Sequence, residues 1–297
     1  MAKRTGGKAP WDSTNTRKAA GKKSKQLTPA QRFLIVPAFA IAGLAAQERS
    51  STTQVWPCVD AARVDPSYVA TADATGGQVY FLHPSESGRT APLMLWSMQH
   101  EELIWRASGE LQEGSREFSF PVDPGVASLV ISAWVQCKQT IVITPPDAAA
   151  SLEQQEFQAG RVVHAAQPEA GTWRVQIAGR GLWSVVASAK GGLSLDSAKF
   201  VRYGGRPGHE GWFPLEGPRN VDSDVVLQVK LSDAVREANY SRVNAKGEAI
   251  AQLQPADGDG LIRFRIAQSG FRLAVDGLDL DGHPFRRMTP AVFMTAK

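Results

Sequence analysis

The chain has 297 residues, of which 43% are hydrophobic and 21% charged, and its formal net charge is +4. This balance is typical of globular proteins and excludes a wholly disordered or fibrous chain. Residues 1–32 hold nine Lys or Arg and one Asp, so the remaining 265 residues carry a net charge of −4. A mildly acidic body is poorly suited to phosphate backbones, which attract Lys and Arg. We therefore expect no nucleic-acid partner for the folded part.

Two segments precede the predicted folded body. Residues 1–32 lack apolar periodicity and are predicted to be disordered. Residues 33–46 form an uncharged apolar run that is shorter than a membrane span but typical of the hydrophobic part of a signal peptide. Cleavage after Ala45 or Ala46 would give a secreted or periplasmic protein. The long basic start leaves two alternatives, an uncleaved membrane anchor or a buried core helix, and only the anchor would bring the protein to a membrane.

The chain contains two cysteines, Cys58 and Cys137. In an exported protein they are predicted to form a disulfide, which would close a loop of about 80 residues and stabilise the fold by roughly 4 kcal/mol. The alternative is a pair of buried free thiols. Neither cysteine lies in a CxxC motif or near a histidine cluster, so no structural metal is expected.

The segment 56–114 is predicted to be helical. Residues 65–82 indicate a short helix that ends at a Gly-Gly turn and leads into an apolar strand, because Gly76 can adopt a positive φ. Residues 93–107 carry apolar side chains at helical spacing and predict a second amphipathic helix.

The apolar period changes from about 3.6 to 2 near Glu117, which indicates strands. We expect a first β-sandwich over residues 115–200. Its strands are predicted at 118–122, 128–135, 139–144, 161–165, 172–178 and 182–190, with Gly179-Arg180-Gly181 as the turn between the last two.

Residues 202–220 are rich in Gly and Pro and are predicted to separate two domains. A second, immunoglobulin-like sandwich is expected over residues 221–297. Its strands are predicted at 224–231, 239–244, 248–253, 261–267, 271–276 and 285–294. The predicted fold class is therefore mainly β, with two tandem antiparallel β-sandwich domains after a small helical segment and a disordered basic N-terminus.

Residues 65–297 resemble a known extracellular family. The sequence Thr-Gly-Gly-Gln-Val at 75–79 is similar to the last helix and strand of von Willebrand factor type A domains. Pro-Glu-Ala-Gly-Thr-Trp-Arg-Val at 168–175 and the hairpin-like segment 275–287 are similar to the region that follows this domain in hemicentin-like proteins. The resemblance implies an immunoglobulin-like module after residue 220. The part of a type A domain that binds metal has no counterpart before Asp65, so the resemblance implies no metal-dependent binding.

No catalytic, cofactor-binding or metal-binding residues are predicted. The chain has neither a nucleophile-elbow motif nor a zinc-helix motif, and its five histidines lie far apart in the sequence. His100-Glu101-Glu102 is expected on a solvated helix face. The aspartate-rich segments 257–260 and 276–282 match calcium loops poorly and are expected to form hairpin turns.

Most tryptophans lie in apolar segments and are expected in the core, whereas Trp212 and Phe213 lie in a Gly-rich segment and are predicted to form an exposed contact loop. The sequence thus favours an extracytoplasmic, non-enzymatic binding or scaffolding protein, adhesion-like, whose partner is another extracytoplasmic protein. The alternative is a carbohydrate-binding module or accessory domain of a glycan-active system, or a hydrolase of unfamiliar type, because of the tryptophan content and because sandwich folds are frequent among sugar-binding modules. A third possibility is a cytoplasmic protein whose basic tail binds nucleic acid.

Overall fold

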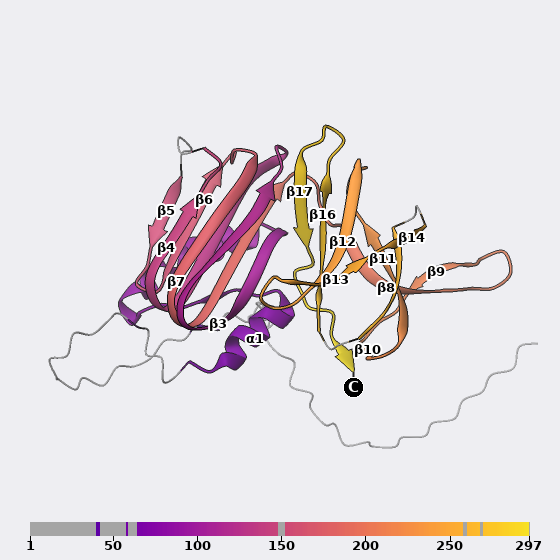
Figure 1. Cartoon of the computed structure of the whole chain (residues 1–297), viewed down its shortest axis with the longest axis horizontal. Coiled ribbons are helices and arrows are strands. Elements are labelled where there is room, and N and C mark those ends of the chain that lie inside the picture. Colours follow the sequence, from indigo (N-terminus) through magenta and orange to yellow (C-terminus); the bar gives the residue numbers. More distant parts are fainter. Residues whose placement is uncertain are drawn as a thin grey trace, which may run out of the picture. The chain divides into compact units, whose positions relative to one another are not determined.

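The computed structural model describes residues 40–41, 58, 64–147, 152–257, 260–267 and 270–296 (Figure 1). The chain divides into two units, 1–36 and 37–297, and all structural statements below concern the second. The predicted disordered segment 1–32 lies outside the described residues. Of the predicted signal segment only β1 (Ala40–Ile41) is described, and it pairs in parallel with β2 (Val79–Tyr80).

The first predicted helix is confirmed as α1 (Pro66–Thr75). The Asp65 carboxylate accepts a hydrogen bond from the Ser67 amide at 2.8 Å, which caps the helix N-terminus. Gly76 ends the helix in the left-handed conformation with φ 80°, as the Gly-Gly turn predicts. The apolar strand that follows is β2, and both of its residues are buried.

The second predicted helix, 93–107, is wrong in its second half. After the 3₁₀ helix η2 (Pro84–Arg89), α2 (Thr90–Gln99) ends before His100, and strand β3 (Glu102–Val122) begins two residues later. The apolar run at 103–105 is buried on consecutive positions because both faces of this part of the sheet are covered. A continuous apolar run of this kind suits a buried strand as well as a helix.

The first sheet has five antiparallel strands in the order β3-β7-β4-β6-β5 (Figure 1). It contains β3 and, in chain order, β4 (Val126–Thr144), β5 (Glu153–Glu156), β6 (Gly160–Ala166) and β7 (Gly171–Gly191). Several strands predicted as separate are therefore continuous: 128–135 and 139–144 both belong to β4, and 172–178 and 182–190 both belong to β7.

Each long strand bends near its middle, so the two halves of the sheet pack on each other. The pairing of β4 with β7 shifts register at Val135/Cys137 and at Lys138/Thr140. The predicted turn 179–181 is instead part of this bend, where Gly179 and Gly181 have φ of 149° and 85°. Side chains from both halves, such as Ile131 and Ile177, share one core. The glycines permit a bend within a continuous strand rather than a chain reversal.

The second group of strands forms a two-sheet antiparallel sandwich (Figure 1). One sheet has the order β14-β15-β11-β8-β9 and the other β13-β12-β16-β17. In chain order the strands are β8 (Ser197–Gly204), β9 (Gly211–Pro214), β11 (Asp224–Lys230), β12 (Glu237–Val243), β13 (Ala249–Leu253), β14 (Pro255–Asp257), β15 (Leu261–Arg265), β16 (Arg272–Leu278) and β17 (Pro284–Met288). Their shared core includes Phe200, Leu227, Tyr240, Val275 and Phe285.

The predicted boundary at 202–220 does not coincide with the sheets. β8, β9 and β10 (Arg219–Asn220) lie in or reach into this segment, and β10 pairs with β18 (Thr295–Ala296). The change from one sheet system to the next falls between Gly191 and Ser197. The Gly and Pro residues in this segment lie in the turn of the β8–β9 hairpin, not in a linker between domains. Turns and linkers are both rich in these residues, so composition does not distinguish them.

Buried arginines join α1, the first sheet and the second sandwich. Arg272 of β16 contacts the carboxylate of Asp73 in α1 at 2.9 Å, and Arg287 of β17 contacts Asp123 at 2.8 Å. Arg106 of β3 donates to the carbonyl oxygens of Ala72 and Gly76 at 3.1 Å, at the negative end of the helix dipole. Burial lowers the pKa of Arg106 to about 10, and the nearby Arg272 acts in the same direction. The arginine therefore stays charged at pH 7.

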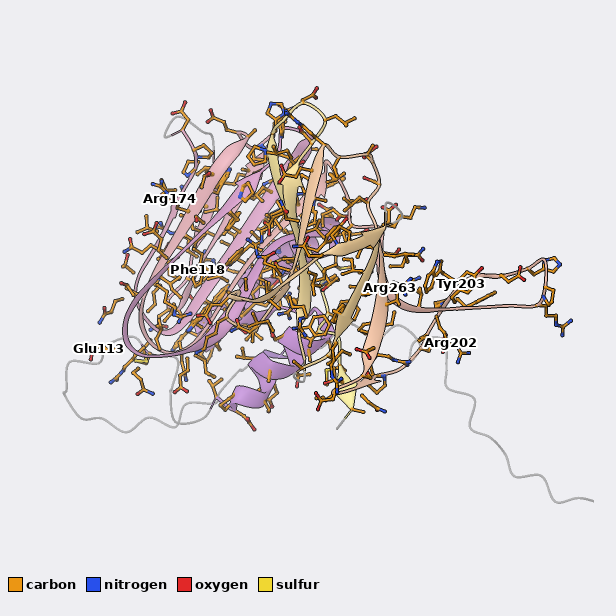
Figure 2. The ribbon with its side chains drawn as sticks, turned by 45° about the vertical axis from the view of Figure 1, so that its right-hand side comes forward. Glu113, Phe118, Arg174, Arg202, Tyr203 and Arg263 are labelled. Carbon is orange, nitrogen blue, oxygen red and sulfur yellow. A yellow bond between two sulfur atoms is a disulfide. The ribbon has the colours of Figure 1, made fainter. Side chains whose placement is uncertain are left out.

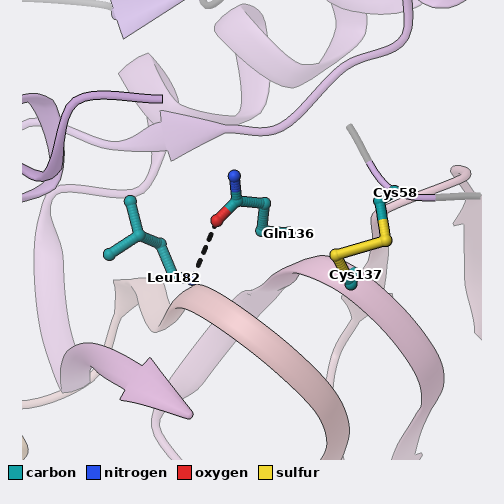
Figure 3. The surroundings of a disulfide bond; sticks show 4 residues. All are labelled: Cys58, Gln136, Cys137 and Leu182. Atoms are coloured by element: carbon teal, nitrogen blue, oxygen red, sulfur yellow. Dashed lines mark hydrogen bonds between the residues drawn. A yellow bond between two sulfur atoms is a disulfide. The ribbon is translucent and has the colours of Figure 1, made fainter. Parts of the chain in front are cut away.

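The predicted disulfide between Cys58 and Cys137 is confirmed (Figure 3). It connects the segment before α1 to the bend of β4, with Cα atoms 4.2 Å apart. The neighbouring Gln136 accepts a hydrogen bond from the Leu182 amide of β7 at 3.1 Å. In the described ranges no helix is long and apolar enough to cross a membrane.

Candidate functional site

The hairpin of β8 and β9 extends beyond the neighbouring strands of its sheet (Figure 1). Its register pairs Tyr203 with Trp212 and Arg202 with Phe213. The tip is closed by a hydrogen bond from the His209 amide to the Arg206 carbonyl at 2.8 Å. Gly205 has φ 128°, and a side chain there would also crowd Glu210, whose Cα would lie 2.9 Å from the added Cβ. The glycine therefore fixes the shape of the tip.

Two large aromatic side chains of this hairpin are exposed to solvent. Tyr203 is 58% exposed and Phe213 is 50% exposed, whereas Trp134, Trp173 and Trp183 of the first sheet are each 1% exposed or less. Of the two predicted contact residues, Phe213 is thus at the surface and Trp212 is half-buried. Tyr203 was not predicted; its exposure depends on strand alternation and on a register that the sequence leaves open.

Trp212 supports the exposed tyrosine rather than lying open itself. The rings of Tyr203 and Trp212 meet edge to face with centroids 5.3 Å apart. The guanidinium of Arg263, from β15, lies 5.8 Å from the Trp212 ring. Figure 2 labels Arg263 and, on the hairpin strand β8, Arg202 and Tyr203. Cation–π and edge-to-face contacts of this kind hold the aromatic group in place.

Phe213 lies on the other face of the hairpin, because neighbouring strand residues point to opposite sides. That face continues into a groove of about 560 Å³ at the hairpin base. The groove is lined by apolar side chains that include Ala198, Phe200, Leu215, Phe293 and Met294, and Met294 is 58% exposed. The register therefore places Phe213 with Arg202 on one face of the hairpin and Tyr203 with Trp212 on the other.

The charge of the hairpin is mainly positive. Lys199, Arg202 and Arg206 are exposed along it, and Glu210 is the exposed acid of the same segment. On the adjoining β15, Arg263 is exposed as well. We define the hairpin contact site as Arg202, Tyr203, Trp212, Phe213 and Arg263.

A second polar cluster lies where α2 packs on the first sheet. The Ser128 hydroxyl of β4 lies 2.8 Å from Nε2 of His100 and 2.9 Å from Nε2 of His164, which is on β6. His164 Nδ1 lies 3.3 Å from the Glu153 carboxylate of β5. The Trp96 ring of α2 stacks on the His164 ring at 5.3 Å with 14° between the planes.

The expectation that His100 lies on a solvated helix face is wrong. His100 follows the last residue of α2 and is 5% exposed. Its pKa lies below the usual value because of burial; the hydrogen bond to the Trp96 carbonyl opposes this effect, while His164 and Lys190 lower the pKa further. The ring is therefore neutral at pH 7.

Sequence reasoning missed this cluster because its members are far apart in the chain. His100 and His164 are 28 and 36 residues from Ser128. The sequence correctly places Ser128 and His164 on strands, at 128–135 and 161–165, but it does not predict that they meet. Their meeting depends on the β4–β6 register, which pairs Ser128 with Ala166 and places His164 diagonally opposite.

The aspartate-rich segment 276–282 spans the end of β16 and the following turn. The Asp279 carboxylate accepts a hydrogen bond from the His283 amide at 2.7 Å, and Asp276 contacts Arg286 at 3.3 Å. Within the described parts of the chain, no three His, Cys, Asp or Glu side chains are grouped to hold a metal ion.

No protein-family model and no curated protein matches the chain. Two solved structures show a weak similarity. The Bacillus licheniformis lipase BlEst2 in propeptide form is 14% identical over 68% of this chain, with a TM-score of 0.29, and the match spans 45% of the lipase. The tandem Ig repeats of Dlar are 10% identical over 63% of this chain and 94% of the repeats, with a TM-score of 0.21. At these scores neither similarity carries a functional argument.

Proposed function

We propose that this protein is an extracytoplasmic binding or scaffolding protein that contacts another protein through the hairpin contact site. The observation behind the proposal is the exposure of Tyr203 and Phe213 on a projecting hairpin, whereas Trp134, Trp173 and Trp183 of the first sheet are buried. Single exposed apolar residues are ordinary, but aromatic residues grouped with arginine are enriched in the energetic centres of interfaces.

Covering the exposed parts of Tyr203 and Phe213 would favour binding. Fully burying an exposed Phe-sized side chain contributes about 1.5–3 kcal/mol, and Tyr203 and Phe213, which are about half exposed, would each gain part of this when a partner covers them. Tyr203 is already oriented by its contact with Trp212, which reduces the entropy lost when a partner covers it. The hairpin contact site therefore combines apolar area with an ordered geometry.

The charge of the hairpin supports an acidic partner surface. Arg202 and Arg263 are exposed, and neither is in an ion pair among the described residues. Complementary charge speeds association and selects the partner. Recognition by side chains is also favoured over strand addition, because Pro214 at the end of edge strand β9 has no amide hydrogen to donate.

Extracytoplasmic location is part of the same proposal. It is supported by the Cys58–Cys137 disulfide, since such bonds persist mainly in oxidising compartments, and by the signal-like segment 33–46. Mass spectrometry of the natural N-terminus tests it: we expect a start at Ala46 or Gln47. A protein that retains its basic start and residues 33–46 would contradict a cleaved signal and favour the membrane anchor or a cytoplasmic protein.

Site-specific crosslinking tests the contact site directly. A photoreactive amino acid at position 203 or 213 is expected to capture a discrete partner from the envelope or secreted fraction, whereas the same group at position 280 is not. Leu280 is a matched control, because it is 67% exposed in a different hairpin, between β16 and β17.

Two outcomes would count against a protein partner. Equal capture from positions 203, 213 and 280 would mean that the hairpin has no special role. Binding to a glycan array that is lost in Trp212→Ala would instead support the carbohydrate-binding alternative.

A further inference from the structure

The cluster around Ser128 contains more polar groups than helix–sheet packing requires. A half-buried hydroxyl lies between two imidazole rings, each of which has a further oxygen at its other nitrogen: the Trp96 carbonyl for His100 and the Glu153 carboxylate for His164. A nucleophile, a base within hydrogen-bonding distance and a third group that orients the base are the recurring parts of nucleophilic catalysis.

The Trp96 carbonyl decides the role of His100. A carbonyl oxygen can only accept a hydrogen bond, so His100 Nδ1, 2.6 Å away, carries the ring hydrogen. In the neutral ring Nε2 then has a free lone pair, which accepts the Ser128 hydroxyl hydrogen at 2.8 Å. Burial lowers the pKa of His100 and so keeps this lone pair available at neutral pH.

We propose that Ser128 is a nucleophile for acyl transfer from small esters, with His100 as its general base. His164 and Glu153 are positioning residues: His164 bonds the same hydroxyl, and its ring stacks on Trp96, the residue whose carbonyl orients His100. This activity goes beyond the proposed binding function and differs from the sequence-based expectation of a non-enzymatic protein.

Ser128 and His164 are partly exposed to solvent, and a cation lies on the neighbouring strand. Ser128 is half-buried rather than enclosed, and the His164 side chain is 18% exposed. Lys190 of β7 is the direct register partner of Ser128 and is exposed. Directly opposed side chains on one sheet face have Cβ atoms about 4.5–5.5 Å apart. The ammonium group of Lys190 can therefore reach the oxyanion that forms when Ser128 attacks a carbonyl.

The reaction is balanced with the residues present and water. Ser128 Oγ bonds to the ester carbonyl carbon while its hydrogen passes to His100 Nε2. The bond from that carbon to the alcohol oxygen then breaks, and the alcohol takes the proton from His100. Water attacks the acyl-serine, gives its proton to His100 Nε2, and releases the carboxylic acid as that proton returns to Ser128.

A fluorophosphonate probe tests this proposal on the full chain. The Ser128 oxygen displaces fluoride from phosphorus, and peptide mapping by mass spectrometry identifies the labelled residue. We expect a label on Ser128, no label in Ser128→Ala, and at least a tenfold slower rate in His100→Gln, since a general base contributes about 10²–10⁴-fold. Ser97→Ala is the matched control: its hydroxyl is also half-buried on α2 but donates to the Met94 carbonyl at 2.9 Å and touches no imidazole in the described structure.

A pH profile separates catalysis from a structural role. The labelling rate of the wild type should fall as acid protonates His100, with a midpoint below pH 6.5, whereas a structural role would leave the rate flat until unfolding. Hydrolysis of p-nitrophenyl acetate should show the same profile and the same ranking of variants.

Three results would overturn the proposal: a folded wild type that excess probe leaves unlabelled, a label mapped to another residue, or equal rates in wild type and His100→Gln. Mapping on the wild type keeps the test valid if a variant fails to fold. Labelling of Ser128 and capture of a partner from position 203 or 213 are separate measurements, so failure here and failure of the hairpin contact site can be told apart.

Discussion

Arginine and aromatic side chains meet in two regions of this protein with opposite surroundings. At the junction of the two sheet systems, Arg272 and Arg287 are buried and each contacts a carboxylate, and Arg286 lies 4.4 Å from the Trp105 ring. Beside the hairpin, Arg263 of β15 lies against Trp212 but remains exposed, as does Tyr203 on the hairpin itself. The same residue types stabilise the fold where they contact a buried carboxylate or ring, and they can bind a partner where their donors face solvent.

The largest change in stability is expected when a buried arginine of the junction is replaced. Arg272→Ala leaves the Asp73 carboxylate buried without its ion-pair partner, and we expect the free energy of unfolding to fall by about 3–5 kcal/mol. Arg265→Ala is the matched control, because its ion pair with Asp222 is 3.9 Å long and more than 60% exposed on both sides. Urea denaturation measures both. Equal losses in the two variants would show that the junction arginines have no special structural role.

The disulfide is expected to contribute somewhat less. Replacing both Cys58 and Cys137 by serine should lower the free energy of unfolding by about 2–4 kcal/mol, because the unfolded chain regains the freedom of a long loop. Reduction of the wild type should shift the denaturation midpoint by a similar amount and leave the double variant unaffected. A midpoint that does not move on reduction would contradict a stabilising role for the bond.

His100 predicts a smaller, pH-dependent effect. Its pKa in the folded protein lies below the usual histidine value of 6.5, so its contribution to stability is complete above that pH. As the pH falls below about 6.5, the unfolded chain binds a proton that the folded protein resists, and stability declines. Denaturation midpoints between pH 7.5 and 5 should fall more steeply for the wild type than for His100→Gln. His209→Gln, in the exposed hairpin tip, should follow the wild type.

The smallest change in stability is expected at the hairpin contact site. Tyr203→Ala/Phe213→Ala removes two exposed side chains, so the free energy of unfolding should change by no more than about 1 kcal/mol in total. Capture of the partner should nevertheless be lost. A large loss of stability in this variant would show that Tyr203 and Phe213 stabilise the fold as the buried junction residues do. It would contradict the view that the hairpin residues serve binding instead.

Local signals in the sequence identified the features that depend on few residues. Gly76 ends α1 where a positive φ is needed, and the period of two correctly indicated β-structure after Glu117. The disulfide followed from the presence of two cysteines in a chain with an export-like start. These features need no knowledge of which strands are neighbours.

Features that depend on distant contacts were missed. In the sequence the bend of β7 looks like a turn, because Gly179 and Gly181 are compatible with a chain reversal as well as with a bend in a continuous strand. Only the pairing of β7 with β4 on both sides of the bend shows that the strand continues. The exposure of Tyr203 and the meeting of Ser128 with His164 are both consequences of strand register. Register depends on the whole set of pairings, so no short motif reports it.

The two strands on either side of the connection between the sheet systems, β7 and β8, are both interior strands of their sheets, and this has a mechanical consequence. β7 lies between β3 and β4, and after a five-residue connection the chain enters β8, which lies between β9 and β11 and leads directly into the hairpin. A partner that pulls on the hairpin tip therefore draws along strands that are hydrogen-bonded on both sides. Such a load would shear many ladder hydrogen bonds at once instead of opening them one by one.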